Sequence, residues 1–143
     1  ESLADELGLM PTPEDRFGRL AARRWRLARV LVDLGVHSRL PVPDDVAVLP
    51  GASREWDRAT VTAVLRHHTV ISEGRLRFEV SRHLGWPAQP LAYAVGERVW
   101  RAGRRSAQAQ ARADGGELDL RAFHNRGIDL GSVGLDLLAS VLH

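Results

Sequence analysis

The sequence predicts an all-α fold: a bundle-like array of about five to seven helices, one of them long and carrying Tyr93. Residues that cap helices precede most apolar runs, and these runs have the three- and four-residue spacing of a helix face. Strand signals are nearly absent, because no sustained alternation occurs and no Asn-Gly or Asp-Gly hairpin joins two β-branched runs. A chain of 143 residues has the length of one domain, so we expect residues 1–143 to form a single all-helical domain.

The first predicted helix begins after Thr12, whose hydroxyl can cap it. Pro13 suits the first turn, and the carboxylates of Glu14 and Asp15 lie at the positive end of the helix dipole. We expect this helix to end at Gly35. Its predicted apolar face consists of Phe17, Leu20, Ala21, Ala28, Leu31 and Val32.

The rest of the chain is predicted as helices separated by breaks. Residues 38–54 contain three prolines and predict a long loop. A helix follows over about 57–68, and Ser72 caps another that stops at Gly85 and Pro87. The remaining expected elements are the long Tyr93 helix up to about Ala113, a break at ADGG, a short helix capped by Asp119, and a last helix in LDLLASVLH.

All 20 basic residues are arginine, and the sequence pI is about 10.3 although the formal net charge is only +2. Such a composition fits either nucleic-acid binding or the codon bias of a GC-rich genome. We favour codon bias, because acidic residues are interspersed with the arginines almost one for one. The sequence contains no basic stripe interleaved with aromatic residues, so we expect no nucleic-acid partner.

The absence of cysteine excludes disulfides, thiol chemistry and Cys-type zinc sites. No run approaches the ~18 apolar residues needed to cross a bilayer, and the acidic start ESLADELG lacks the apolar core of a signal peptide. We therefore expect a cytoplasmic protein without a membrane partner. The first residue, Glu1, indicates a chain that is processed, trimmed or cut from a longer one.

The Tyr93 helix has two contrasting faces. One is an apolar stripe, and the other, called here the tyrosine stripe, contains Gln89, Tyr93, Gly96, Trp100 and Gly103. A surface helix normally carries charge on its second face, so a partner packed against the tyrosine stripe is one interpretation. The other is that Tyr93 and Trp100 pack on a loop of this chain. The apolar stripe consists of Leu91, Val95, Val99, Ala102 and Ala109.

A charged stripe on the first helix contains Arg26, Arg29, Asp33 and His37. Arg29 and Asp33 have the i,i+4 spacing of an ion pair, although an exposed pair contributes only about 0.3–0.5 kcal/mol. Spacing alone favours a solvated charged face.

The succession RLARVLVDLGVH, VISEGRLRFEVSRHLGWPAQPLAYAVGE and LDLRAFHNRGIDLGSVGLDLL resembles the C-terminal third of a bacterial family, domain of unknown function number 885. The resemblance departs at Ala88, where the family has Gly, at Gly134, where it has Pro, and in a longer loop after His37. The matching positions are Arg29, Asp33, Gly35 and His37, then Pro87, Gln89 and Tyr93, then Phe123, His124, Gly131 and Leu135.

This family is similar to helical zinc metallopeptidases, in which an upstream HExxH helix binds the metal. The chain has no HExxH, and the adjacent His67 and His68 point about 100° apart on a helix. The resemblance therefore implies a C-terminal segment of a larger metallopeptidase-like protein, with no metal site or cofactor of its own. Zinc is expected in the complete enzyme, and the chain alone is expected to be inactive.

The resemblance implies roles for four residues of this segment. Tyr93 is the expected catalytic residue, with its hydroxyl donating a hydrogen bond to the oxyanion of a tetrahedral intermediate. Gln89 would orient the tyrosine or the substrate, and Arg29 and His37 would bind a substrate carboxylate or supply a second donor. His124 is expected to cap or pack.

The resemblance also implies partners. They are the missing N-terminal half or a partner chain, and a peptide-like substrate. The alternative function is a non-catalytic helical module that binds a protein through the Tyr93 and Trp100 face.

Overall fold

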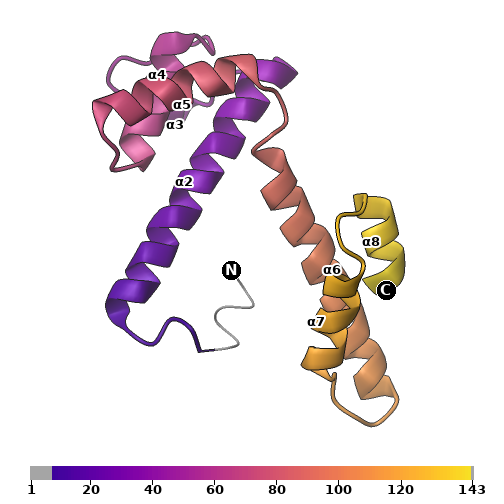
Figure 1. Ribbon diagram of the computed structural model, residues 1–143. Helices are drawn as coiled ribbons and strands as arrows, with labels where there is room; N and C mark the ends of the chain where they lie inside the picture. The colour runs from indigo at the N-terminus through magenta and orange to yellow at the C-terminus, as the bar shows by residue number, and fades with distance from the viewer. Residues whose placement is uncertain (1–7, 143) are drawn as a thin grey trace. The chain divides into compact units, whose positions relative to one another are not determined.

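The computed structural model describes residues 8–142, which form helices and no strand (Figure 1). The all-α prediction is confirmed, and the seven helices of this range fall within the expected number. None of the helices in the described range is long and apolar enough to span a membrane. The helices are α2 (Pro13–Ser38), α3 (Asp44–Ala47), α4 (Arg58–His68), α5 (Glu73–Gly85), α6 (Leu91–Ala113), α7 (Leu120–Asp129) and α8 (Leu135–Leu142).

The chain divides into two compact units, Glu1–Leu91 and Ala92–His143. The first contains α2 to α5, and the second contains α7, α8 and nearly all of α6. The expectation of a single domain over residues 1–143 stays a prediction.

Predicted caps start two helices of the first unit, α2 at Thr12 and α5 at Ser72. The Thr12 hydroxyl accepts from the backbone N–H of Asp15 at 3.1 Å, and the Asp15 carboxylate accepts from the backbone N–H of Thr12 at 3.2 Å. This reciprocal capping box satisfies two backbone donors at the start of α2. At the starts of α4 and α5, the side chains of Asp57 and Ser72 each accept one backbone N–H, from Thr60 and Arg75 respectively.

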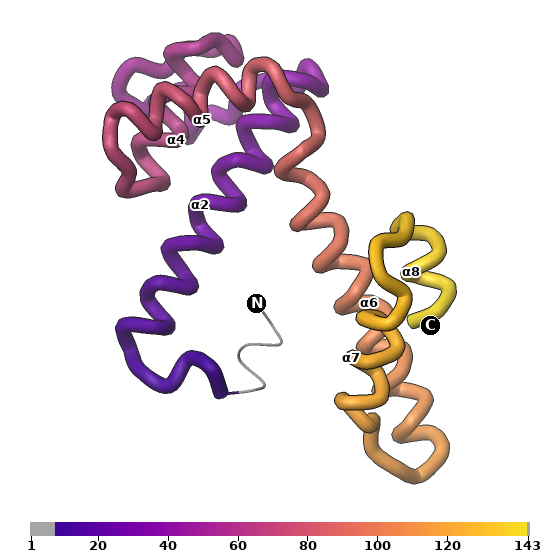
Figure 2. The backbone as a smooth tube through the Cα atoms, viewed as in Figure 1, coloured from indigo at the N-terminus to yellow at the C-terminus, as the bar shows by residue number. Residues whose placement is uncertain are grey.

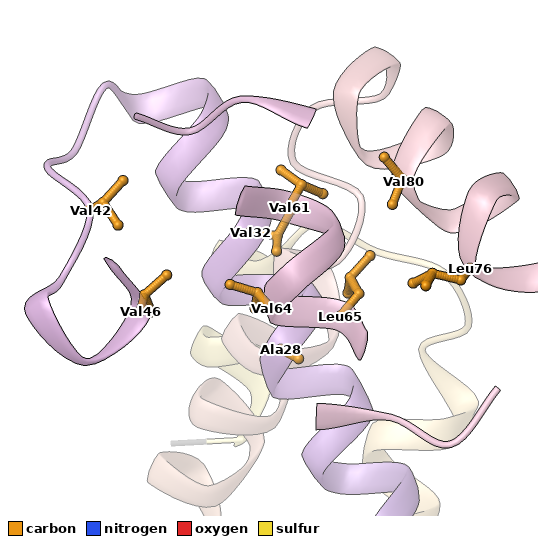
Figure 3. Packing of buried hydrophobic residues seen from close by; sticks show 9 residues of the cluster. All are labelled: Ala28, Val32, Val42, Val46, Val61, Val64, Leu65, Leu76 and Val80. Carbon is orange, nitrogen blue, oxygen red and sulfur yellow. The ribbon is translucent and has the colours of Figure 1, made fainter. Parts of the chain in front are cut away.

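Buried aliphatic side chains from α2, α4 and α5 form the core of the first unit (Figure 3). The apolar face predicted for α2 is correct only in its C-terminal half, where Ala28 and Val32 are buried. Phe17 is 73% exposed and Leu20 is 57% exposed, because the core meets α2 only near its C-terminal end. The buried cluster consists of Ala28, Val32, Val42, Val46, Val61, Val64, Leu65, Leu76 and Val80.

The prediction that Gly35 ends the first helix is wrong. Helix α2 continues to Ser38, and the residue in the left-handed conformation is Arg39, with φ of 53°. A Cβ placed on Gly35 would lie 2.1 Å from the indole of Trp56. The glycine is therefore required for close approach of this ring to the helix, and not for termination.

The predicted loop over residues 38–54 is correct except for one helical turn, α3. Asp44 and Asp45 lie in its first turn, where their negative charges interact favourably with the positive end of the helix dipole. Val46 on this turn and Val42 before it are buried in the core. The loop is thus held by apolar contacts at its middle.

In the second unit, α7 and α8 pack on one face of α6 (Figure 2). A Cβ on Gly127 of α7 would lie 2.4 Å from the Trp100 ring, and one on Gly103 would lie 2.5 Å from the Leu142 Cβ. The ring centroids of Trp100 and Phe123 are 5.3 Å apart at an interplanar angle of 71°. Two glycines thus allow large side chains to fill the space between the helices.

Candidate functional site

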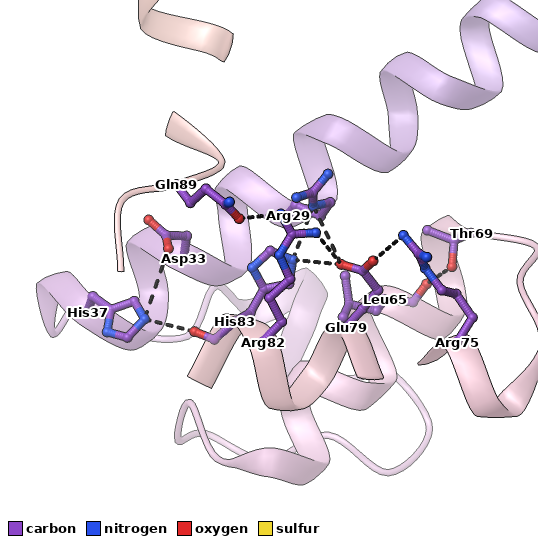
Figure 4. Close-up of polar contacts among 10 residues, drawn as sticks. All are labelled: Arg29, Asp33, His37, Leu65, Thr69, Arg75, Glu79, Arg82, His83 and Gln89. Atoms are coloured by element: carbon purple, nitrogen blue, oxygen red, sulfur yellow. Dashed lines mark hydrogen bonds and ion pairs between the residues drawn. The ribbon is translucent and has the colours of Figure 1, made fainter. Parts of the chain in front are cut away.

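Three ionisable side chains are buried where α2 faces α5: Asp33, Glu79 and His83, each at most 1% exposed (Figure 4). Arg29 lies beside them, with only 11% of its side chain exposed. The interpretation of the α2 charged stripe as a solvated face is therefore wrong for Asp33 and Arg29. Buried charges are costly unless they are paired, so the partners of each group decide what this cluster can do.

Three arginine side chains lie around the Glu79 carboxylate. Its Oε1 lies 2.7 Å from Nη2 of Arg75, and its Oε2 lies 3.8 Å from Nε of Arg29 and 3.7 Å from Nη1 of Arg82. The contacts to Arg29 and Arg82 are longer than a hydrogen bond, and neither carboxylate oxygen has a hydrogen-bond partner among the described residues, so charge attraction holds the carboxylate. Three cations surround one buried anion.

His83 lies against both charges of this cluster. Its Nε2 is 3.2 Å from Arg29 Nε and 3.4 Å from Glu79 Oε2. Burial, followed by the positive charge of Arg29, lowers the pKa of His83 below its ordinary value of 6.5, although Glu79 opposes this. The neutral imidazole accepts the Arg29 N–H at Nε2, so its proton is on Nδ1, which is buried without a hydrogen-bond partner among the described residues.

Asp33 connects the cluster to the turn between α5 and α6. Each of its carboxylate oxygens lies 3.0 Å from the backbone nitrogen of Ala88, whose N–H donates to them. Ala88 has φ of 66°, a left-handed conformation that favours glycine, and it stands where the family that the sequence resembles has glycine. The hydrogen bond to a buried carboxylate holds this strained turn in place.

Two of the predicted substrate-binding residues, His37 and Gln89, form hydrogen bonds at the edge of this cluster. His37 Nε2 donates to the backbone carbonyl oxygen of His83 at 2.8 Å, and lies 4.0 Å from Asp33 Oδ1. Gln89 is exposed, and its side-chain oxygen accepts a hydrogen bond from Nη2 of Arg82. The structure therefore brings Arg29, His37 and Gln89 into one polar network. Arg29 bonds the side chain of His83, His37 bonds the His83 backbone carbonyl, and Gln89 is linked through Arg82 to Glu79.

Tyr93 lies in the other unit, at the first turn of α6, and its side chain is 61% exposed. The tyrosine stripe is divided. A Cβ on Gly96 would meet no atom within 4 Å, whereas Trp100 and Gly103 pack on α7 and α8. The interpretation that Trp100 faces a missing partner is therefore wrong, because its ring fills the core of its own unit. His124 packs as predicted, with its ring stacked 5.9 Å from that of Trp100.

Sequence reasoning missed Glu79, Arg82 and His83. A signal was present, because Glu79 and His83 share the i, i+3, i+4, i+7 spacing with Leu76 and Val80. All four lie on the buried face of α5. Ionisable residues at apolar-face positions of a helix indicate a buried polar network.

The residues present do not fit a zinc ion. Among residues 8–142, no group of three or more His, Asp or Glu side chains could hold a metal. The two buried carboxylates already have partners: the arginines for Glu79 and the Ala88 N–H for Asp33.

Nearly the whole chain matches the model of one protein family. Its description is "Bacterial protein of unknown function (DUF885)", and the match covers residues 1–142. No curated protein matches the chain.

Proposed function

The chain belongs to the DUF885 family of bacterial proteins, and from this membership we propose that it is the C-terminal substrate-cleft segment of a zinc-dependent, peptidase-like hydrolase. One observation carries the proposal: the Tyr93 side chain is 61% exposed, while Trp100 and Gly103 of the same stripe are packed within their unit. The only tyrosine of the chain is thus available to a substrate.

In the proposed mechanism, Tyr93 acts on the transition state. Its hydroxyl donates a hydrogen bond to the oxyanion that forms when a peptide carbonyl becomes tetrahedral. This bond strengthens as negative charge develops, so it lowers the barrier more than it tightens substrate binding. Gln89 binds the substrate beside Arg82, and Arg29 and His37 support that region through Glu79, His83 and the His83 carbonyl.

The metal ligands of the proposed hydrolase come from residues outside this chain. The chain alone is inactive under this proposal.

The test is peptide hydrolysis by the complete protein, in which the chain is joined to the segment that supplies the metal ligands. We expect turnover that is lost on dialysis against a chelator and regained with zinc, with no turnover by residues 1–143 alone. Failure of the complete protein to hydrolyse any member of a mixed peptide library, with zinc bound, would overturn the proposal.

The alternative, a non-catalytic helical interaction module, also has one observation in its favour. Helix α2 exposes Phe17, Leu20 and Leu27. Exposed apolar residues at helical spacing are typical of a surface that binds another protein. Tight binding of a partner that buries these residues, with full binding retained by Tyr93→Phe and no hydrolysis, would favour this function.

A further inference from the structure

Helix α2 has an apolar stripe that is separate from the face packed within the first unit. Phe17, Leu20, Leu27 and Leu31 recur with the alternating spacing of the a and d positions of a coiled coil, and Arg24 occupies the remaining position. Helix α2 extends beyond α4 and α5 at its N-terminal end (Figure 1), and Phe17, Leu20 and Leu27 are each more than half exposed. These five residues are called here the α2 seam.

The α2 seam borders a groove of about 520 Å³. Its apolar lining comes mainly from Leu20, Leu27 and Leu31, and His68 of α4 also contributes to it. Leu20 and Leu31 are about three helical turns apart, or roughly 16 Å along the axis of α2. A helix of three to four turns laid along α2 would cover this length and bury the exposed leucines.

The polar side chains that line the groove are cationic or neutral. Arg24 donates from Nε to Nδ1 of His68 at 3.2 Å, and from Nη2 to the backbone carbonyl oxygen of His67 at 3.4 Å. Arg23 is exposed, and neither arginine forms an ion pair with a carboxylate within residues 8–142. Arg23 stands at a g position of the heptad, where coiled coils place the charges that select a partner. Acidic side chains on the occupant would complement this lining.

A second copy of α2 does not have this chemistry. Between Asp15 and Asp33, the helix contains six arginines and no acidic residue. Two α2 seams packed together would therefore bring arginine against arginine. The occupant must have a different sequence, with carboxylates beside its apolar residues.

We infer that the α2 seam is the docking surface for an acidic amphipathic helix, and that this helix belongs to the segment that supplies the metal ligands. The source of the helix rests on the proposed function, in which that segment must be held against the helix that carries Arg29 and His37. The chemistry of the helix rests on the lining of the groove. Its apolar side chains pack between Leu20 and Leu31, and its carboxylates pair with Arg23 and Arg24.

The chemistry of the occupant is tested on the chain of residues 1–143 with two synthetic helical peptides of three heptads. Both have leucine at the a and d positions, and they differ in having glutamate or lysine at every e and g position. We expect saturable binding of the glutamate peptide, measured by calorimetry, at least about tenfold tighter than that of the lysine peptide. Binding of neither peptide, or equal binding of both, would overturn the inference.

Variants locate the binding on the α2 seam. Leu27→Glu should lose binding of the glutamate peptide, whereas Val48→Glu, which changes an exposed residue that does not line the groove, should retain it. If Leu27→Glu fails to fold by circular dichroism, Arg23→Glu serves instead, and it should shift the preference toward the lysine peptide. Unimpaired binding in Leu27→Glu, or an unchanged preference in Arg23→Glu, would contradict the site.

The source of the helix is tested in the complete protein. The chain contains no cysteine, so Leu27→Cys places a single thiol of this chain in the groove, and mass spectrometry measures its alkylation. We expect alkylation at least about tenfold slower in the complete protein than in residues 1–143, because the docked helix covers the thiol. Equal rates, or equally tight binding of the glutamate peptide to both proteins, would overturn the assignment to that segment.

Peptide hydrolysis by the complete protein is measured separately. A protected thiol without hydrolysis supports this inference and counts against the proposed function. Hydrolysis with an unprotected thiol does the reverse.

Discussion

Gly35→Ala is the most direct perturbation of the core of the first unit. The added Cβ would lie 2.1, 2.4 and 2.5 Å from three ring carbons of Trp56. Real Cβ contacts are longer than 3.0 Å, so the rigid indole must shift by about 1 Å or more within the core. Overpacking of this kind costs about 3 kcal/mol, and the better helix propensity of alanine returns up to about 1 kcal/mol. We expect a net loss of about 2 kcal/mol.

The assay is urea denaturation followed by circular dichroism. Gly18→Ala is the matched control, because Gly18 is an exposed residue of the same helix and its added Cβ would meet no atom within 4 Å. The control should be stabilised by about 0.5–1 kcal/mol through helix propensity alone. A Gly35→Ala protein as stable as wild type would refute the packing of Trp56 on α2.

Three further predictions concern the second unit, the turn at Ala88 and the buried His83. Gly127→Ala should destabilise the second unit by about 1–3 kcal/mol through overpacking against Trp100, whereas Gly96→Ala should not, as thermal melting will show. Ala88→Gly should stabilise the first unit by about 1 kcal/mol, because glycine adopts the positive φ of this residue without strain. Asp33→Ala should destabilise it by about 2 kcal/mol, because the Ala88 N–H loses its acceptor. Both are measured by urea denaturation, and a destabilised Ala88→Gly with a stabilised Asp33→Ala would contradict the turn geometry. Burial and Arg29 lower the pKa of His83 in the folded chain, so below about pH 6.5 His83 takes up a proton more readily in the unfolded chain than in the folded one. The contribution of His83 to the unfolding free energy should therefore be full above about pH 6.5 and fall as the pH decreases below it. In His83→Gln this loss, measured as the unfolding free energy down to about pH 5, should be smaller than in wild type, and an unchanged slope would assign it to other groups.

Local signals in the sequence predicted most helix boundaries. Thr12, Ser72 and Asp119 each cap the helix expected after them, because a side-chain oxygen three residues before a free N–H needs no tertiary contact to act. Gly35 was wrongly predicted to end the first helix, because glycine is common at helix ends. Only the position of Trp56 shows that this glycine is needed for the close packing of the indole ring on α2. That contact joins residues that no local pattern relates.

Tertiary partners explain the rest of what the sequence did not show. Helical periodicity identified the apolar face of α2, but periodicity does not tell where along a helix the core lies. Asp33 and Ala88 are separated by 55 residues, so spacing on the helix suggested a solvated charge where the fold buries one. The resemblance selected Arg29, His37 and Gln89, and the structure shows a network among them that includes Glu79, Arg82 and His83.

The most direct measurement of the central claim is the turnover of Tyr93→Phe in the complete, zinc-loaded protein, together with its melting temperature. The substitution removes one hydroxyl from a largely exposed side chain, so the melting temperature should stay at the wild-type value. Loss of one oxyanion donor should lower kcat by about 10²–10³, with a much smaller change in KM. Unchanged kcat would contradict the assignment of Tyr93 as the catalytic donor, and a large fall in melting temperature would show that its hydroxyl is structural.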